Sequence, residues 1–123
     1  MKAVIQRVNQ ASVKVEGQII SKIESGLLVL LGITHTHGPE ETKWLCNKIV
    51  NLRIFNDEIG VMNKSLKDVQ GDVIIVSQFT LMASTKKGNR PSYIKAANKK
   101  IAIHIYERFI IEFESVLGKK VGT

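Results

Sequence analysis

The pattern of apolar positions along the chain is clearest at residues 73–76, where four β-branched apolar side chains follow one another. They come directly after Gln70, Gly71 and Asp72, a combination typical of a turn. A short run that is apolar at consecutive positions is typical of a strand whose two faces are both covered. The pattern therefore predicts a central strand of a sheet.

Polar residues follow at the end of this strand. Ser77, Gln78 and Thr80 carry hydrogen-bonding groups where a buried strand would stay apolar. If the strand continued, Gln78 and Thr80 would share one face, and Ser77, Phe79 and Leu81 the other. Buried polar groups are costly unless the protein or a ligand satisfies them. These residues either end the strand and bond the local backbone, or they form a functional site; the pattern alone leaves both interpretations open.

Earlier segments predict the rest of the sheet. Strands are expected at residues 2–9, at the alternating residues 11–15, and at the runs 19–23 and 27–33, which follow turns. The run 27–33 is apolar on both faces and is expected at the centre of the sheet. Arg7 shares a strand face with apolar neighbours, so it is either paired or part of a site.

Two helices complete the pattern. Pro39, with two glutamates after it, predicts a helix start, and Leu45, Ile49 and Leu52 form its apolar stripe, with Trp44 expected in the core. A second helix is predicted over residues 92–117. Its recurring apolar positions are Ile94, Ala97, Ile101, Ile105, Phe109 and Phe113. Strands joined by tight turns, with helices against one side, predict an α+β fold.

Composition adds limits. A chain of 123 residues predicts a single domain, residues 1–123, and its 44% hydrophobic content is ordinary. The apolar runs are too short to span a membrane, and the charged start has no signal-peptide core. The only cysteine, Cys46, excludes an internal disulfide and is consistent with a reducing cytoplasm. His35 and His37 have the spacing of a metal pair but no third ligand nearby, so we expect neither a metal nor a cofactor.

The net charge of +7 is unevenly distributed. Residues 1–61 hold 7 Lys/Arg against 6 Asp/Glu, whereas residues 62–123 hold 11 against 5. The segment 84–100 is basic and contains no acidic residue. Within it, Gly88 allows close backbone approach, and Pro91 followed by Ser92 is typical of a helix start. Such a segment favours a polyanionic partner, although a solvated basic surface remains the alternative.

The polar strand end and the basic segment together resemble a known family. Ser77-Gln78-Phe79-Thr80-Leu81, followed by Lys87-Gly88-Asn89-Arg90-Pro91-Ser92-Tyr93, is similar to the D-aminoacyl-tRNA deacylases, at a spacing specific to this pair of motifs. Residues 4–8, 11–15 and 26–30 fit the same family, so the resemblance covers nearly the whole chain. It implies a sheet-rich sandwich with a helical layer, assembled as a homodimer.

The resemblance also implies an activity. These enzymes hydrolyse the ester between a D-amino acid and the 3′-terminal adenosine of tRNA, which removes D-amino acids before translation uses them; glycine is a further expected acyl group. The amides around Phe79 and Thr80 would stabilise the oxyanion, where one donor is worth about 3 kcal/mol. Gln78 would position the adenosine or the water. The expected substrate-binding residues are Ser77, Arg7, Lys86, Lys87, Gly88, Arg90, Pro91 and Ser92, with Lys86, Lys87 and Arg90 on phosphates.

Three questions stay open at this point. Thr80 lacks a base within its motif, which favours a pocket-shaping role, although the family resemblance also allows a nucleophile. A non-catalytic RNA-binding module and a small-ester hydrolase that uses Thr80 are the alternative functions. Family members usually continue into strands with an Asn-x-Gly-Pro-x-Thr motif, whose cis turn is held by the residue that Arg7 matches. We therefore expect a C-terminally incomplete domain, a weaker dimer and poor rejection of L-aminoacyl-tRNA.

Overall fold

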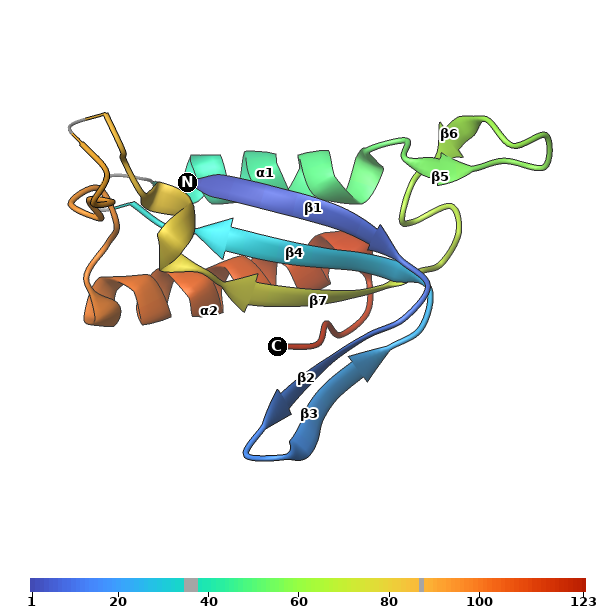
Figure 1. The fold of residues 1–123 in the computed structure, drawn as a ribbon. Coiled ribbons are helices and arrows are strands. Elements are labelled where there is room, and N and C mark those ends of the chain that lie inside the picture. Colours follow the sequence, from blue (N-terminus) through green and yellow to red (C-terminus); the bar gives the residue numbers. More distant parts are fainter. Residues whose placement is uncertain (35–37, 87) are drawn as a thin grey trace.

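The computed structural model describes residues 1–34, 38–86 and 88–123. Its centre is a three-stranded sheet in the order β1 (Lys2–Val8), β4 (Gly26–Gly32) and β7 (Asp72–Ser77). The helices α1 (Pro39–Asn51) and α2 (Lys99–Leu117) both lie on one face of this sheet (Figure 1). Two hairpins extend from it: β2 (Ala11–Val15) with β3 (Gln18–Ile23), and β5 (Phe55–Asn56) with β6 (Met62–Lys64).

The sheet combines two kinds of pairing. β1 and β4 are antiparallel, as are β2 and β3, and a tight turn joins the second pair. β7 instead lies parallel to β4, with Gly26 opposite Asp72 and Leu31 opposite Ser77. The connection between β4 and β7 contains α1, which carries the chain back to the same end of the sheet, as parallel pairing requires. The α+β class with a helical layer is confirmed.

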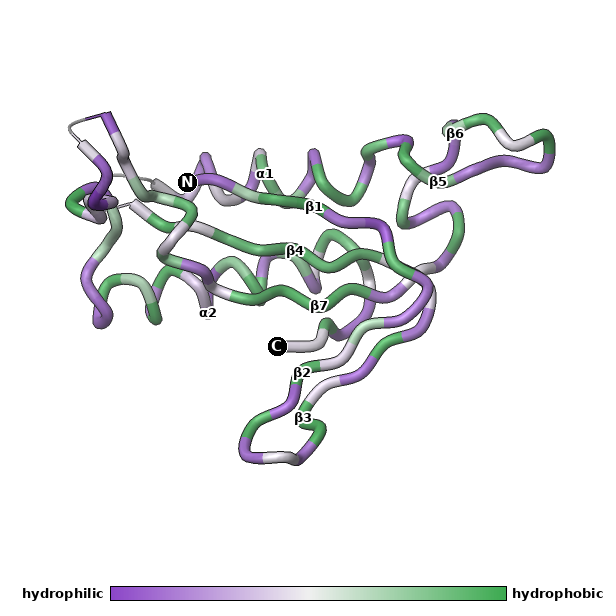
Figure 2. The backbone as a smooth tube through the Cα atoms, in the orientation of Figure 1, coloured by the Kyte–Doolittle hydropathy of each residue, from purple (hydrophilic) through white to green (hydrophobic). Residues whose placement is uncertain are grey.

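The core lies between the sheet and the helices. Leu27, Val29 and Leu31 on β4 and Val73 and Ile75 on β7 are fully buried there. From the other side they meet fully buried residues of α1 and α2, which are Cys46, Ile49, Val50, Phe109 and Phe113. Figure 2 shows the continuous apolar colouring of β4 and β7, which agrees with their burial. β4 is therefore the central strand, with a partner on each side.

Trp44 is not in the core; its side chain is 63% exposed. The buried positions of α1 are Thr42, Cys46, Ile49 and Val50. Trp44 lies two positions from both Thr42 and Cys46, which is roughly half a helical turn and places it on the opposite face. The expectation of a buried tryptophan was wrong because the predicted apolar stripe of Leu45, Ile49 and Leu52 is rotated relative to the stripe that is buried.

The second helix is shorter than predicted. It begins at Lys99, and the side chain of Asn98 accepts a hydrogen bond from the Ile101 N–H at 3.0 Å. This N-cap ends the non-helical chain before it, so Pro91 and Ser92 are not a helix start. Ile94 is 82% exposed and does not belong to the apolar stripe. The C-terminal end is confirmed, since Gly118 caps the helix at φ +87°.

The segment 55–68 contains the β5–β6 hairpin. Asp57 holds its turn by accepting hydrogen bonds from the backbone of Ile59 and Val61, each at 3.0 Å. These bonds, that to Val61 first, lower the pKa of Asp57. In the part of the chain that the structure describes, no helix is long and apolar enough to cross a membrane.

Candidate active site

The polar residues after β7 leave the sheet at once. β7 ends at Ser77, and the N–H of Gln78 donates to the Leu31 carbonyl at 2.8 Å as the last bond to β4. Residues Phe79–Met82 then form one turn of 3₁₀ helix. The two-face alternation expected for a continuing strand therefore does not apply. The side chains of Gln78 and Thr80 nevertheless meet, because the Gln78 amide Nε2 donates to Thr80 Oγ1 at 2.5 Å.

Gly32 explains why this turn can lie against the end of β4. A Cβ at Gly32 would approach the Leu81 Cβ to 2.9 Å and the Met82 sulfur to 3.1 Å. Real Cβ atoms do not come that close to a neighbouring Cβ, so only glycine leaves room for the turn. The position of the turn thus depends on a glycine in a different strand.

The first two residues of the turn have N–H groups that make no hydrogen bond within it. Its first internal bond is donated by Leu81 N–H to the Gln78 carbonyl at 3.3 Å, so Phe79 N–H and Thr80 N–H precede the bonded part of the turn. Both residues are exposed. Two adjacent N–H groups at the start of a helical turn can donate hydrogen bonds to a carbonyl oxygen and so stabilise the negative charge that develops on it. This arrangement is the geometric basis for an oxyanion site.

A pocket of about 450 Å³, which we call the strand-end pocket, lies between this turn and the start of α2. Its lining includes Ser77, Phe79, Tyr93, Lys99, Ile103 and Tyr106. The Phe79 and Tyr93 rings meet edge to face, with centroids 5.0 Å apart. The Tyr106 hydroxyl donates to the Ile75 carbonyl at 2.5 Å, which ties α2 to β7 next to Ser77. Burial raises the pKa of Tyr106, so its phenol stays protonated at neutral pH.

The chain between Ser84 and Ser92, which we call the basic loop, is closed at its two ends by a backbone pair. Ser84 and Ser92 pair as an isolated bridge, with N–H···O distances of 2.7 and 2.8 Å in the two directions. Lys86, Arg90 and Pro91 are exposed between them, while Lys87 lies outside the described residues. Gly88 has φ +93° with nothing within 4 Å of an added Cβ. The positive φ favours glycine here, and the expected close approach of its backbone to the substrate stays a prediction.

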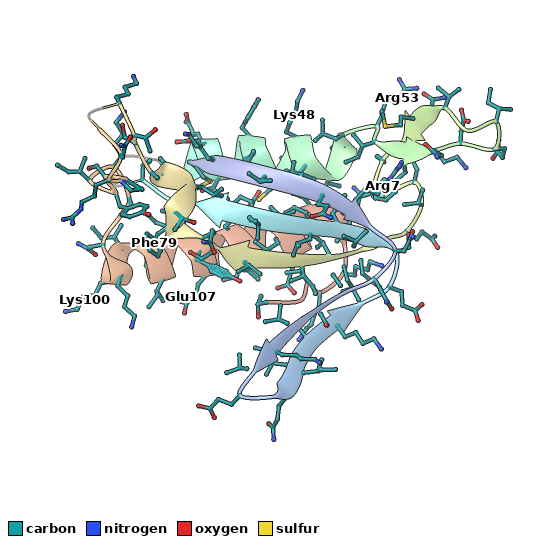
Figure 3. The ribbon with its side chains drawn as sticks, viewed as in Figure 1. Arg7, Lys48, Arg53, Phe79, Lys100 and Glu107 are labelled. Carbon is teal, nitrogen blue, oxygen red and sulfur yellow. The ribbon has the colours of Figure 1, made fainter. Side chains whose placement is uncertain are left out.

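Arg7 is the predicted site residue that the fold does not bring to the turn. It lies opposite Leu27, which pairs with Val73, so it is four strand positions, or about 13 Å, from the level of Ser77. Its Nη1 donates to the Ile54 carbonyl at 2.9 Å and to Asn56 Oδ1 at 3.3 Å. Figure 3 shows Arg7 and Phe79 at opposite ends of the sheet.

Among the residues of the strand-end pocket that sequence reasoning missed are Tyr106 and Lys99. Tyr106 carries a hydroxyl among the apolar positions of the second helix, and that contrast was the available signal. Lys99 and Lys100 stand in the first turn of α2, where acidic residues are absent. Positive side chains at the positive end of a helix are unfavourable in isolation, which was the signal for a nearby anion. Among the described residues, no group of three or more His, Cys, Asp or Glu could hold a metal ion.

Comparison with known proteins agrees with the motifs. The family model of D-Tyr-tRNA(Tyr) deacylase matches residues 4–123. The D-aminoacyl-tRNA deacylase of Christiangramia forsetii is 59% identical over 123 residues, and that of Bacteroides thetaiotaomicron is 57% identical, each over 100% of this chain and 82% of the relative. The chain belongs to the D-Tyr-tRNA(Tyr) deacylase family. The resemblance stated from the motifs is thereby confirmed.

Two solved structures share the fold. A c-Myc DNA Unwinding Element Binding Protein is 40% identical with a TM-score of 0.91, covering 100% of this chain and 85% of that one. A probable eukaryotic D-amino acid tRNA deacylase has a TM-score of 0.81 at 19% identity, covering 94% and 68%. At that identity the second likeness concerns the fold alone.

Proposed function

We propose that the chain hydrolyses the ester joining a D-amino acid to the 3′-terminal adenosine of tRNA, and that the reaction takes place at the strand-end pocket. Family membership supports the reaction. The observation that supports the location is that Phe79, the first residue of the 3₁₀ turn, lines this pocket and contacts Tyr93, which directly follows the basic loop. Hydrolysis here returns free tRNA and a free D-amino acid, which is proofreading of mischarged tRNA.

The chemistry requires water to attack the ester carbonyl. The carbonyl oxygen takes up the negative charge, and the amides of Phe79 and Thr80 stabilise it. Collapse of the tetrahedral intermediate breaks the bond to the ribose oxygen, which leaves as the hydroxyl of adenosine after taking a proton. Gln78 lies where its side chain can position the water or the adenosine while its Nε2 holds Thr80.

Thr80 is proposed to shape the pocket rather than to attack. Its hydroxyl accepts a hydrogen bond from the Gln78 amide, and an amide does not remove a proton from a hydroxyl group. His104, the described histidine of α2, lines a different cavity. Mass spectrometry of the enzyme during turnover tests this proposal. An aminoacyl ester on Thr80 would identify it as the nucleophile.

The acceptor end of tRNA fits the surroundings of the pocket. Phe79 and Tyr93 are exposed by 58% and 39%, and an aromatic pair of this kind provides a face on which an adenine base can stack. Lys86 and Arg90 in the loop and Lys99 and Lys100 on α2 bring positive charge to both sides of that pair. Phosphate contacts of this type give affinity without reading the base sequence. Aminoacyl-tRNA as substrate also places the enzyme in the cytoplasm.

A homodimer is part of the proposal. The sheet face away from the helices is open: Val4 is 48% exposed, and Val15, Ile19 and Ile20 on the neighbouring hairpin are each more than half exposed. A second copy would cover these side chains. Val4→Glu should then lower the dimer fraction in analytical ultracentrifugation, whereas Ile59→Glu, at the tip of the other hairpin, should leave it unchanged. A monomeric parent chain at all concentrations would contradict the proposal.

The deciding experiment follows deacylation of matched D- and L-tyrosyl-tRNA, with and without a chelator, together with D-tyrosine methyl ester. The proposed enzyme hydrolyses the D-tyrosyl-tRNA, and Gln78→Ala reduces its rate while the exposed hairpin variant Gln18→Ala does not. Tight binding of charged and uncharged tRNA without turnover would instead indicate an RNA-binding module. Equal cleavage of the methyl ester without tRNA would indicate a small-ester hydrolase.

A further inference from the structure

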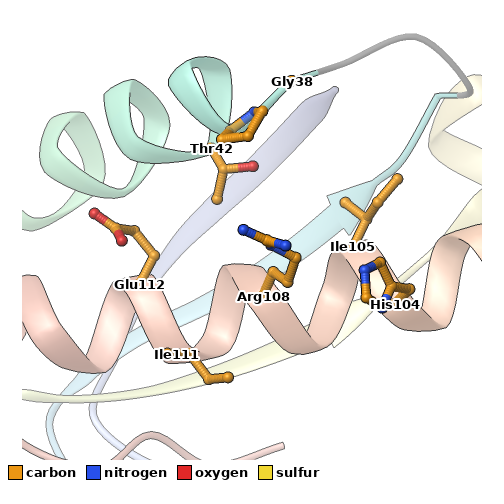
Figure 4. A pocket seen from close by; sticks show the side chains of 8 residues that line it. Gly38, Thr42, His104, Ile105, Arg108, Ile111 and Glu112 are labelled. Carbon is orange, nitrogen blue, oxygen red and sulfur yellow. The ribbon is translucent and has the colours of Figure 1, made fainter.

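A second cavity, of about 490 Å³, lies between the start of α1 and the middle of α2. We call it the interhelical cavity; the lining residues that matter are Thr42, His104, Ile105, Arg108, Ile111 and Glu112 (Figure 4). None of them lines the strand-end pocket. The helix α2 turns Ile103 and Tyr106 to one cavity and Ile105 and Arg108 to the other.

Thr42 is the buried polar group of this cavity. Its side chain is 7% exposed, and its hydroxyl is directed into the space between the helices. Its backbone N–H donates to the Gly38 carbonyl at 3.4 Å, but the hydroxyl has no hydrogen-bond partner in residues 1–34, 38–86 and 88–123. Because no fully buried side-chain oxygen or nitrogen of the described residues lacks a hydrogen-bond partner, this hydroxyl is still reached by water from the cavity. A polar ligand atom in the cavity would supply the missing partner.

Two opposite charges face the same space. Arg108 and Glu112 stand one turn apart on α2, about 6 Å along the axis, and both are directed toward α1. Within the described part of the chain, neither has an ion-pair partner, not even the other. Glu112 is close enough to α1 that its charge, after burial, helps raise the pKa of Cys46 to about 12. Thr42, one turn before Cys46, lines the same cavity as Arg108 and Glu112.

We propose that the interhelical cavity binds a free α-amino acid as its zwitterion. The ligand carboxylate contacts Arg108 and accepts a hydrogen bond from the Thr42 hydroxyl. The ligand ammonium contacts Glu112, and the ligand side chain packs on Ile105 and Ile111. A simple anion would leave Glu112 facing like charge, and a simple cation would do the same at Arg108. Arg108 is exposed and Glu112 is half-buried, and a ligand that carries both charges can contact the two side chains at once. The cavity volume lies within the range usual for small-molecule sites.

The test uses isothermal titration calorimetry with leucine and two analogues that each lack one charge, 4-methylpentanoate and 3-methylbutylamine, together with inorganic phosphate. Leucine should bind with saturation, and each analogue should bind about tenfold more weakly, because one charge-assisted contact is lost. Phosphate binding tighter than that of leucine, or no saturable leucine binding, would overturn the proposal. No tRNA or turnover is involved, so the result is independent of the proposed deacylation.

Three variants assign the contacts. Glu112→Gln should weaken leucine about tenfold and leave 4-methylpentanoate unchanged, because that analogue has no ammonium to lose. Arg108→Gln should also weaken leucine binding about tenfold but leave the binding of 3-methylbutylamine unchanged, because that analogue has no carboxylate. Thr42→Val keeps the side-chain shape but removes the hydroxyl, so it should weaken the binding of leucine and of 4-methylpentanoate, the two ligands with a carboxylate. Glu107→Gln, on the same helix but outside this cavity, is the matched control. Equal weakening of all ligands by every variant, or a loss in the control, would contradict the assignment; circular dichroism excludes misfolding as the cause.

Discussion

The strand-end pocket and the interhelical cavity have nearly the same size, about 450 and 490 Å³, yet their charges differ. The first is flanked by Lys86, Arg90 and Lys99 without a neighbouring carboxylate among its lining residues. The second holds one arginine and one glutamate. Volume therefore says little about their ligands. The sign and balance of the charge distinguish a site for a polyanion from a site for a small zwitterion.

The starts of the two helices show the same contrast. α1 opens with Pro39, Glu40 and Glu41, and Glu41 pairs with the N-terminal ammonium at 3.2 Å, so its positive end is already compensated. α2 opens with Lys99 and Lys100 and no acidic residue. Its positive end is therefore not compensated by acidic side chains of its first turn, and under the proposed function it faces phosphates of the tRNA. If this comparison is right, changes at one cavity should leave the other unaffected.

The largest effect is expected from Gly32→Ala. The new methyl would contact Leu81 at 2.9 Å and displace the 3₁₀ turn, and a shift of about 1 Å in a catalytic group can cost about 100-fold in kcat/KM. Deacylation kinetics measure this loss. Gly38→Ala, where nothing lies within 4 Å, is the control at the other cavity and should retain the rate. Full activity of Gly32→Ala would mean that the turn does not hold the reacting group.

Tyr106→Phe should cost about 1–2 kcal/mol of unfolding free energy, because the Ile75 carbonyl loses its 2.5 Å hydrogen bond in a partly buried place. Urea unfolding provides the measurement. Tyr93→Phe is the matched control, since its ring contact with Phe79 does not need the hydroxyl. Leucine binding at the interhelical cavity should be the same in both variants. Equal stability of the two variants would show that the Tyr106 hydroxyl contributes nothing.

Cys46 predicts an alkaline dependence beside the interhelical cavity. Burial first, and then the Glu112 charge, raise the pKa of its thiol from 9.0 to about 12. The folded state thus holds the proton more tightly, so stability is complete below pH 9.0 and falls as the pH rises toward about 12, by up to about 1.4 kcal/mol per pH unit. Urea unfolding between about pH 8 and about pH 10 should show a flatter dependence for Cys46→Ala. Parallel curves would contradict the assignment.

The smallest effect is expected for single charges of the basic loop. Lys86→Ala and Arg90→Ala should each weaken tRNA binding by a similar factor for all tRNAs, and each should reduce the slope of log affinity against log salt by about one. Fluorescence anisotropy over a salt series measures this slope. Lys48→Ala, an exposed lysine on α1, is the control. Unchanged slopes in both loop variants would remove the loop from the tRNA interface.

Much of this fold could be predicted from local pattern. The strands β1 to β4, the start of α1 at Pro39 and the end of α2 at Gly118 follow alternation, run length and capping residues, which act over a few positions. Trp44 and Ile94 were misplaced because helical spacing alone does not say which of two adjacent stripes faces the sheet. The Asn98 cap was a local signal that could have corrected the second helix.

The candidate site was predictable only in part. The motif placed Gln78, Phe79 and Thr80 at a strand end, and they are there. The turn itself depends on Gly32, and the pocket depends on Tyr93 and Tyr106, which reach it from distant segments. Contacts of that kind leave no periodic trace in a sequence. The roles assigned to Ser77, Arg7 and the loop residues stay predictions, and the Lys86 and Arg90 variants test those of the loop.

The parallel pairing of β4 with β7 has a consequence for the order of folding. Pairing of β1 with β4 closes only the connection that contains the β2–β3 hairpin. Pairing of β7 with β4 closes a longer connection, which contains α1 and the β5–β6 hairpin. Closure of long loops is entropically expensive and slows the formation of the contacts behind it. We expect β1 and β4 amides to gain hydrogen-exchange protection before those of β7. The catalytic turn, which begins where β7 ends, would then form last during refolding, and recovery of deacylase activity would report the final step.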